Sequence, residues 1–202
     1  MRAVELNFNT CKRHTLELAK ILDGYFTAKG YDKTKIVGSF NWDPMEKIVV
    51  KGLDTVALLA QAPQIVEAMK EYPNFRTICV NAVALNNNGA YIVQELGYAL
   101  AWGNEYMNQL VEAGTDADEA AKNIKFNLGI SENFFMEMAK FRAARMLWAE
   151  IVKQYAPKDD ASCMMCVNAA TSKYNMTMFD SYVNMLRSQT EAMSAALAGV
   201  HQ

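Results

Sequence analysis

Hydrophobic residues along the chain follow two alternating patterns. Short apolar, β-prone runs occur at five places, and each is followed by a segment with apolar residues spaced i, i+3, i+4 and i+7. The runs predict strands over 3–9, 36–42, 75–85, 124–130 and 162–170. Because strands and helices alternate without hairpin signals, we expect parallel strands joined by right-handed crossovers.

The predicted helices carry start and stop signals. After the first strand, residues 16–26 predict a helix that ends near Gly30. The residues Asp43-Pro44-Met45-Glu46 combine a capping aspartate, a first-turn proline and a glutamate, which is typical of a helix start. Pro63 divides the next helical stretch into two helices. Further helices are predicted over 90–114, 132–155 and 180–198, with a short one after the capping residues 115–118.

Five β/α units fit either a doubly wound open sheet or a (β/α)₈ barrel. No G-x-G-x-x-G or G-x-x-x-x-G-K motif follows a predicted strand, which weakens the nucleotide-binding open sheet. Asparagines recur near the middle or end of the strands, and Cys-Val-Asn-Ala occurs at both 79–82 and 166–169. Strands that face one shared interior would show this repeat, although asparagines at strand ends also make independent turns.

We therefore predict an α/β fold of the parallel (β/α) TIM-barrel type, as a single domain over 1–202. A complete barrel takes roughly 250 residues and eight units, so this one would be incomplete, with about five of the eight. Its two terminal strands would then be edges without a partner strand. An incomplete barrel is expected to associate with itself or with another chain.

Composition and charge narrow the classes of function. The net charge is −2 and no basic block occurs, which gives no electrostatic case for a nucleic acid or an anionic membrane. The first residues lack the pattern of a signal peptide, and no apolar run approaches the roughly 20 residues needed to cross a bilayer. Four cysteines without a secretion signal are typical of reduced thiols in the cytoplasm.

Candidate metal and acid–base groups are few. Cys163 and Cys166 have the spacing of a zinc or redox motif, and Cys11 and His14 could supply the other half of a metal site. Residues three apart on a strand point to opposite faces, so we predict buried core cysteines and no metal site. His14 precedes a predicted helix and His201 lies at the chain end; they are the only histidines, and neither lies beside a nucleophile at a strand end.

Two lysines occur at unexpected positions. Lys125 lies at the start of a predicted strand, and Lys173 lies in a strand-to-helix loop. An interior lysine needs a partner or water, so each marks a wet cavity or an interface. In contrast, we interpret four charged residues of the helix 132–155 as solvated or interface-facing: Glu137, Lys140, Arg142 and Arg145.

Three segments resemble the barrel domain of methylmalonyl-CoA mutases: NGAYIVQELGYALAWGNEYMNQLVEAG, NFFMEMAKFRAARMLWAEIV and YVNMLRSQTEAMSAALAGVHQ. The resemblance is strong over about 74–202 and looser before it. It implies an enzyme that interconverts methylmalonyl-CoA and succinyl-CoA by a radical rearrangement dependent on adenosylcobalamin. It also implies an acyl-CoA chain along the barrel axis and a separate cobalamin domain, which we expect to be absent from residues 1–202. In many bacteria two homologous chains form a heterodimer, and only the large one is catalytic.

The resemblance implies that catalytic groups are missing from this sequence. The family's Tyr-His pair falls on Val83 and Ala84, and its glutamate near the cofactor falls on Asn87. An arginine and a serine that contact CoA in the family fall on Asn123 and Lys125.

A second family motif is also altered. The run Arg-Thr-His-x-Gln-Thr-Ser-Gly-Trp falls on 166–174 and begins here with Cys166. Only Thr171 and Ser172 are kept, and the glycine becomes Lys173, whose side chain would crowd the channel. Without these groups little remains to hold a thioester or to shut out water.

We therefore expect a structural chain that resembles the small, non-catalytic chain of these heterodimers and pairs with the catalytic large chain. It would bind no cofactor or metal itself, and adenosylcobalamin would belong to the intact complex. Two alternatives remain open: a divergent acyl-CoA mutase, or an acyl-CoA-binding module. Either would use a rebuilt polar pocket lined by Asn81, Asn87, Lys125, Asn127, Asn168 and Lys173.

Overall fold

The computed structural model describes residues 4–54 and 56–201. Within them the strands are β1 (Leu6–Phe8), β2 (Gly38–Phe40), β3 (Phe75–Arg76), β4 (Ile78–Asn81), β5 (Ile124–Ile130) and β6 (Cys166–Thr171). The α-helices are α1 (Thr15–Ala28), α2 (Met45–Lys51), α3 (Val56–Leu59), α4 (Ala62–Ala68), α5 (Val83–Asn87), α6 (Ile92–Glu112), α7 (Ala117–Asn123), α8 (Phe134–Lys153) and α9 (Ser181–Leu197). All strand pairs are parallel, so the predicted α/β class is confirmed.

The strands form two open sheets, in the orders β1-β2-β3 and β4-β5-β6. Only Thr77 separates β3 from β4, and the backbone N–H of Cys79 donates to the carbonyl of Trp42, just beyond β2, at 3.0 Å. The two sheets are therefore continuous through the segment 75–81. Among the described residues β1 and β6 pair on one side only, and no closed barrel forms.

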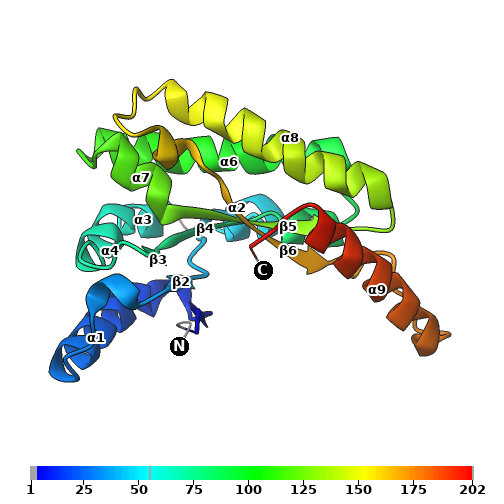
Figure 1. The fold of residues 1–202 in the computed structure, drawn as a ribbon, viewed down its shortest axis with the longest axis horizontal. Helices are drawn as coiled ribbons and strands as arrows, with labels where there is room; N and C mark the ends of the chain where they lie inside the picture. The colour runs from blue at the N-terminus through cyan, green and yellow to red at the C-terminus, as the bar shows by residue number, and fades with distance from the viewer. Residues whose placement is uncertain (1–3, 55, 202) are drawn as a thin grey trace.

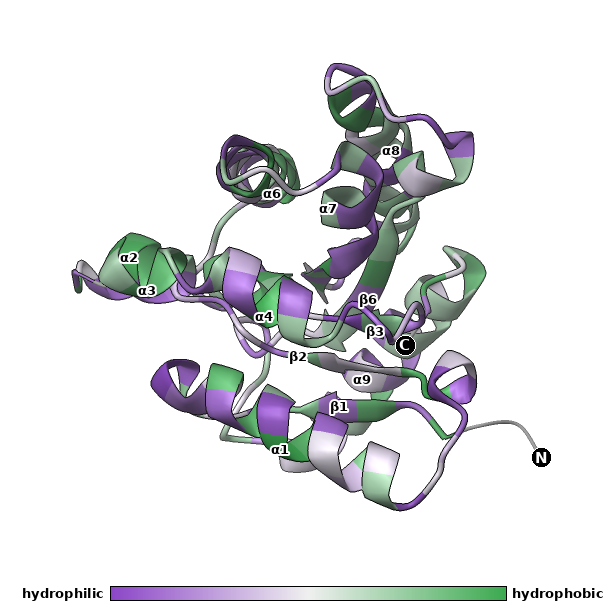
Figure 2. Cartoon of the chain, turned by 90° about the vertical axis from the view of Figure 1, so that its left-hand side faces the viewer, coloured by the Kyte–Doolittle hydropathy of each residue, from purple (hydrophilic) through white to green (hydrophobic). Residues whose placement is uncertain are grey.

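Helices α6, α7 and α8 cover one side of the β4-β5-β6 sheet, whereas α1 lies beside β1 and β2, and α9 extends beyond β6 (Figure 1). Hydrophobic and hydrophilic segments alternate along α1, as one buried face requires (Figure 2). Under the covering helices Phe126 of β5 meets Trp148 of α8 edge-on, with ring centroids 4.7 Å apart. No helix in the described ranges is long and apolar enough to cross a membrane.

The predicted strand over 75–85 is wrong beyond Asn81. Ala82 has helical backbone angles (φ −72°, ψ −8°), and α5 follows at once. The turn after α5 passes through Gly89 at φ +86°, a conformation that glycine adopts at low cost. The apolar run Val83-Ala84-Leu85 is therefore the first turn of a short helix, which suits the helix propensity of Ala84 and Leu85.

The predicted strand over 162–170 begins too early. Asp160–Cys163 forms a 3-10 turn, which starts where the carboxylate of Asp159 accepts from the backbone N–H of Ala161 at 2.9 Å. Strand β6 starts at Cys166. Cys163 is thus not on a strand, and the argument from opposite strand faces does not apply to it. In contrast, β5 has the predicted bounds 124–130.

Candidate functional site

The side chain of Lys125 defines a concave face of the sheet. From β5 its ammonium donates to Ser39 Oγ on β2 at 2.6 Å and to Asn7 Oδ1 on β1 at 3.3 Å. Strands β5 and β1 are not neighbours in either sheet. A contact between them therefore requires the combined sheet to bend around this face.

Two rows of side chains line the concave face, set by the register of β4, β5 and β6. The first row is Cys79, Lys125 and Cys166, and the second row is Asn81, Asn127 and Asn168. Alternate residues of a strand point to the same side, so both rows face the same interior. The repeated Cys-Val-Asn-Ala segments thus place equivalent side chains on β4 and β6.

A cavity of about 290 Å³ opens over these rows and is lined by Asn7, Asn41, Asn81, Val83, Lys125, Asn127, Asn168, Ala169 and Ala170. Three lining amides have buried Oδ1 atoms without a hydrogen-bond partner in the described structure, those of Asn41, Asn127 and Asn168. Burial lowers the pKa of Lys125, which is 2% exposed. The cavity is therefore polar, and its lining carries one charged side chain.

Four of the six predicted pocket residues lie at this cavity, and two lie elsewhere. Asn87 and Lys173 meet each other, where Asn87 Oδ1 accepts from the backbone N–H of Lys173 at 2.8 Å. The side chain of Lys173 is exposed and does not line the cavity. The expected crowding of the interior by Lys173 is therefore wrong, because its loop is tied to α5.

The positions matched to family catalytic groups are divided between places. Val83 lines the cavity, and Cys166 lies beside Lys125 in the first row. The carbonyl of Ala84 accepts from the side chain of Asn88 within the α5 turn. Asn123 lies at the amino end of β5, where its Oδ1 accepts from the hydroxyl of Thr77 at 2.9 Å. Only part of the matched set therefore faces the shared interior.

Sequence reasoning treated Asp43 as a helix cap and missed its other contacts. Its carboxylate accepts from the backbone N–H of Glu46 at 3.2 Å, the backbone N–H of Asn81 at 2.7 Å and the hydroxyl of Tyr106 at 2.8 Å. Asp43 is fully buried, and burial raises its pKa to about 7. It joins the end of β2 to β4 and α6. The Asp-Pro signal gives the cap alone, because Tyr106 is distant in sequence.

The interpretation of the α8 charges as solvated is wrong for Lys140 and Glu137. The ammonium of Lys140 lies 2.7 Å from Glu95 Oε2 and 2.6 Å from Glu137 Oε2, and all three side chains are fully buried. It also donates to the carbonyl of Gly129 on β5 at 2.8 Å. Burial raises the pKa of Glu95, although Lys140 opposes this. The cluster fastens the carboxyl end of β5 to α6 and α8.

The two arginines of α8 differ from this cluster. Arg145 donates to the carbonyl of Ala198 at 2.8 Å, just after α9, and so fastens the end of that helix to α8. Arg142 is exposed, as predicted. Arg145 therefore has a structural role within the chain, whereas Arg142 faces solvent.

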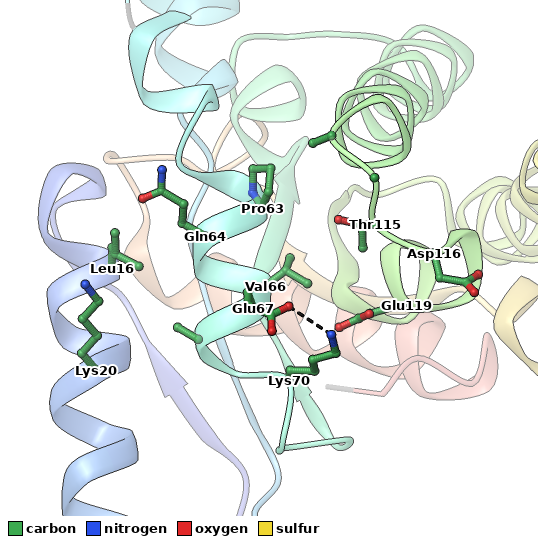
Figure 3. A pocket seen from close by; sticks show the side chains of 13 residues that line it. Leu16, Lys20, Pro63, Gln64, Val66, Glu67, Lys70, Thr115, Asp116 and Glu119 are labelled. Carbon is green, nitrogen blue, oxygen red and sulfur yellow. Dashed lines mark hydrogen bonds and ion pairs between the residues drawn. The ribbon is translucent and has the colours of Figure 1, made fainter.

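A larger groove of about 760 Å³ lies between α1, α4 and the connection from α6 to α7 (Figure 3). Lys20 projects from α1 at one side, and Glu67 and Lys70 form an ion pair of 3.1 Å on α4. Both side chains of that pair are more than half exposed. The groove therefore displays solvated charges and no buried reactive group.

The described residues contain no group of three or more His, Cys, Asp or Glu side chains placed to hold a metal ion. The imidazole of His14 contacts Glu17 at 3.0 Å on the surface, and that of His201 contacts the backbone of Val167. Neither histidine lines the cavity on the concave face. Three of the four free cysteines are buried, namely Cys79, Cys163 and Cys166.

Comparisons with known proteins agree with the quoted motifs. A sequence profile of the Methylmalonyl-CoA mutase family matches residues 7–202. The methylmalonyl-CoA mutase small subunit of Porphyromonas gingivalis is 46% identical over 201 residues, which are 99% of this chain and 32% of that protein. Methylmalonyl-CoA mutase of Cereibacter sphaeroides is 42% identical over 130 residues, which are 64% of this chain and 18% of that protein.

The mitochondrial methylmalonyl-CoA mutase of Homo sapiens is 33% identical over 178 residues, which are 85% of this chain and 24% of that protein. The chain thus spans about a third or less of the length of these curated relatives. The match nevertheless covers nearly the whole of this sequence. On this evidence the chain belongs to the methylmalonyl-CoA mutase family.

Proposed function

We propose that this chain is a non-catalytic structural part of a methylmalonyl-CoA mutase and acts as the partner of a catalytic large chain. The observation that carries the proposal is the lining of the cavity on the concave face, which includes Val83 and carries one charged side chain, that of Lys125. A mutase of this family must hold a thioester and exclude water during radical chemistry. Neutral amides and small apolar groups offer little for that task.

The strand order supports the finer proposal that the chain forms part of a (β/α)₈ barrel. Neighbouring strands follow the order of the chain, as in a barrel, and the order does not reverse as it does in a doubly wound sheet. The contact of Lys125 with β1 and β2 supports a curved interior. Strands β1 and β6 would be completed by further strands, because an edge leaves backbone donors and acceptors unpaired.

We assign the cofactor to the partner chain, and the chemistry of the side chains at the cavity supports this assignment. When bound, adenosylcobalamin supplies the radical that starts the rearrangement. The described residues of this chain do not fit that group, because His14 and His201 both lie away from the cavity. We place the complex in the cytoplasm, where the four free thiols would stay reduced.

Co-expression with the catalytic large chain tests the proposal. Size-exclusion chromatography is expected to show one stable complex that isomerises methylmalonyl-CoA when adenosylcobalamin is added. The chain alone, under the same conditions, is expected to show no isomerisation. Failure to form the complex, or turnover by the chain alone, would contradict the structural role.

A second candidate is an acyl-CoA-binding module, favoured by the cavity with Lys125 and five asparagines on the concave face. At about 290 Å³ it lies just under the roughly 300–1,000 Å³ of usual ligand pockets. Calorimetric titration with acetyl-CoA and with methylmalonyl-CoA separates the candidates. Saturable binding would favour the module, and a purely structural chain is expected to give no heat beyond dilution.

A further inference from the structure

The ammonium of Lys125 lacks both a counter-charge and a full set of acceptors. An ammonium has three N–H donors, and the acceptors within the described structure are Ser39 Oγ at 2.6 Å and Asn7 Oδ1 at 3.3 Å. Both acceptors are neutral, and no described carboxylate forms an ion pair with Lys125. One N–H therefore remains for a group inside the cavity. A buried charge of this kind is costly unless it is paired.

Charged and titratable neighbours do not supply the missing counter-charge. The thiols of Cys79 and Cys166 flank Lys125, but burial raises the pKa of both, that of Cys79 to about 12, so both are neutral at pH 7. Glu5 raises the pKa of Lys125, while Arg76 lowers it. Near neutral pH these influences oppose each other and leave the ammonium unbalanced.

The second row of the concave face adds unpaired hydrogen-bond acceptors. The buried Oδ1 atoms of Asn41, Asn127 and Asn168 have no partner in the described structure, and Asn168 is only 9% exposed. All three residues line the cavity together with Lys125. Water would satisfy the amide oxygens, but it would not neutralise the ammonium. A simple inorganic anion would neutralise the ammonium but would leave the amide oxygens without a donor.

We propose that this cavity binds a small hydroxycarboxylate. The carboxylate accepts the free N–H of Lys125 and balances its charge, and the hydroxyl donates to an asparagine oxygen of the second row. The volume of about 290 Å³, just under the usual range of ligand pockets, admits a small ligand. The site is distinct from the proposed partnership with a catalytic chain, and either can stand without the other.

Calorimetry and NMR on the full chain test this site with sodium lactate as the probe. Lactate is expected to bind saturably, while neutral lactamide does not. With lysine labelled at ¹³Cε, lactate is expected to move the titration of Lys125 to higher pH, because a bound carboxylate favours the charged ammonium. Lys125→Met identifies the resonance and is expected to weaken lactate binding at least tenfold. Lys173→Met is the matched control, since that lysine is exposed and outside the cavity.

A second variant guards against misfolding of the first. Asn168→Leu keeps Lys125 but replaces an amide acceptor of the cavity by a methyl group, so it is expected to weaken lactate binding at least tenfold while the far-ultraviolet circular dichroism stays unchanged. Absence of lactate binding to the wild type, or equal binding to Lys125→Met, would overturn the inference. Equal affinity for acetate would remove the role of the hydroxyl and overturn it likewise. Binding of acetyl-CoA without lactate would overturn it in favour of the acyl-CoA-binding module.

Discussion

Two buried lysines lie on opposite sides of strand β5, and they differ in whether neighbouring groups balance their charge. Lys125 on the concave face and Lys140 on the helix-covered side are both 2% exposed. Lys140 lies against two carboxylates and a backbone carbonyl, so its charge is balanced within the chain. Lys125 has neutral partners and faces a cavity. The buried lysine on the helix-covered side thus has counter-charges within the chain, and the buried lysine on the concave side has none in the described structure.

The segments that resemble the family and the positions that depart from its catalytic groups also lie in different places. The segments quoted for the resemblance form α6 and α8, which cover one side of the sheet, and α9, which extends beyond β6. Two of the positions matched to catalytic groups, Val83 and Cys166, lie on the concave side. A chain can keep its scaffold while its interior changes, because contacts such as the buried ion pairs of Lys140 with Glu95 and Glu137 lie behind the sheet.

The largest expected effect comes from disrupting the buried cluster of Lys140, Glu95 and Glu137. Lys140→Met leaves the carboxylates of Glu95 and Glu137 buried without their cation, and is expected to cost about 3–5 kcal/mol of unfolding free energy. Urea denaturation measures the change. Lys153→Met on the same helix is the control, because its pair with Glu150 is more than half exposed and is worth under about 1 kcal/mol. Similar losses in the two variants would contradict the contrast.

Buried Asp43, which contacts Tyr106 of α6, is expected to make the stability of the helix-covered side depend on pH. Burial raises its pKa from 3.8 to about 7, so the folded state holds the proton more tightly than the unfolded state. This contribution is complete below about pH 4 and is lost as the pH rises to about 7. At about 1.4 kcal/mol per pKa unit, the loss is on the order of a few kcal/mol.

The Asp43→Asn variant tests that pH dependence. It is expected to lack this fall, so that it is less destabilised relative to the wild type at pH 8 than at pH 5. Denaturant melts across pH 4–8 provide the measurement. A difference between variant and wild type that stays constant with pH would show that Asp43 does not titrate in this range.

Packing behind the sheet is tested by two glycines of α6. A Cβ on Gly103 would lie 2.5 Å from Phe126 Cζ and 2.9 Å from Trp148 Cζ3, so Gly103→Ala is expected to cost about 1–3 kcal/mol. Gly97 has no atom within 4 Å of an added Cβ. Gly97→Ala is therefore expected to stabilise the helix by about 0.5–1 kcal/mol. Thermal unfolding of both variants measures the difference, and equal shifts would contradict the tight contact.

The smallest effect is expected on the concave face. Without a ligand, Lys125→Met removes an unbalanced buried charge, and the unfolding free energy is expected to change by less than about 1 kcal/mol or to rise. Because burial lowers the pKa of Lys125, the wild type should gain stability as the pH rises toward 10.5, and the variant should not. Urea melts at pH 7 and pH 10 measure both. A loss as large as that of Lys140→Met would abolish the distinction between the two lysines.

Local patterns in the sequence determined most of the elements. The long period of 132–155 gave α8, the apolar run 124–130 gave β5, and Asp180 caps α9 through the N–H groups that its carboxylate accepts. The repeated Cys-Val-Asn-Ala also indicated a shared interior, because equal register on parallel strands places equal residues on one face. These features depend on neighbours along the chain.

Long-range contacts decided the rest. Val83–Asn87 forms a helix although it continues an apolar strand, and buried Asn86 there donates to Glu95 of α6 at 3.1 Å. Glu137 and Lys140 became a closed cluster only because α6 brings Glu95 to them. Lys125 found Asn7 and Ser39 only because the sheet bends. Periodicity tells which face of an element is apolar, but the curvature of the sheet and the paths of its loops decide which buried charges meet a partner.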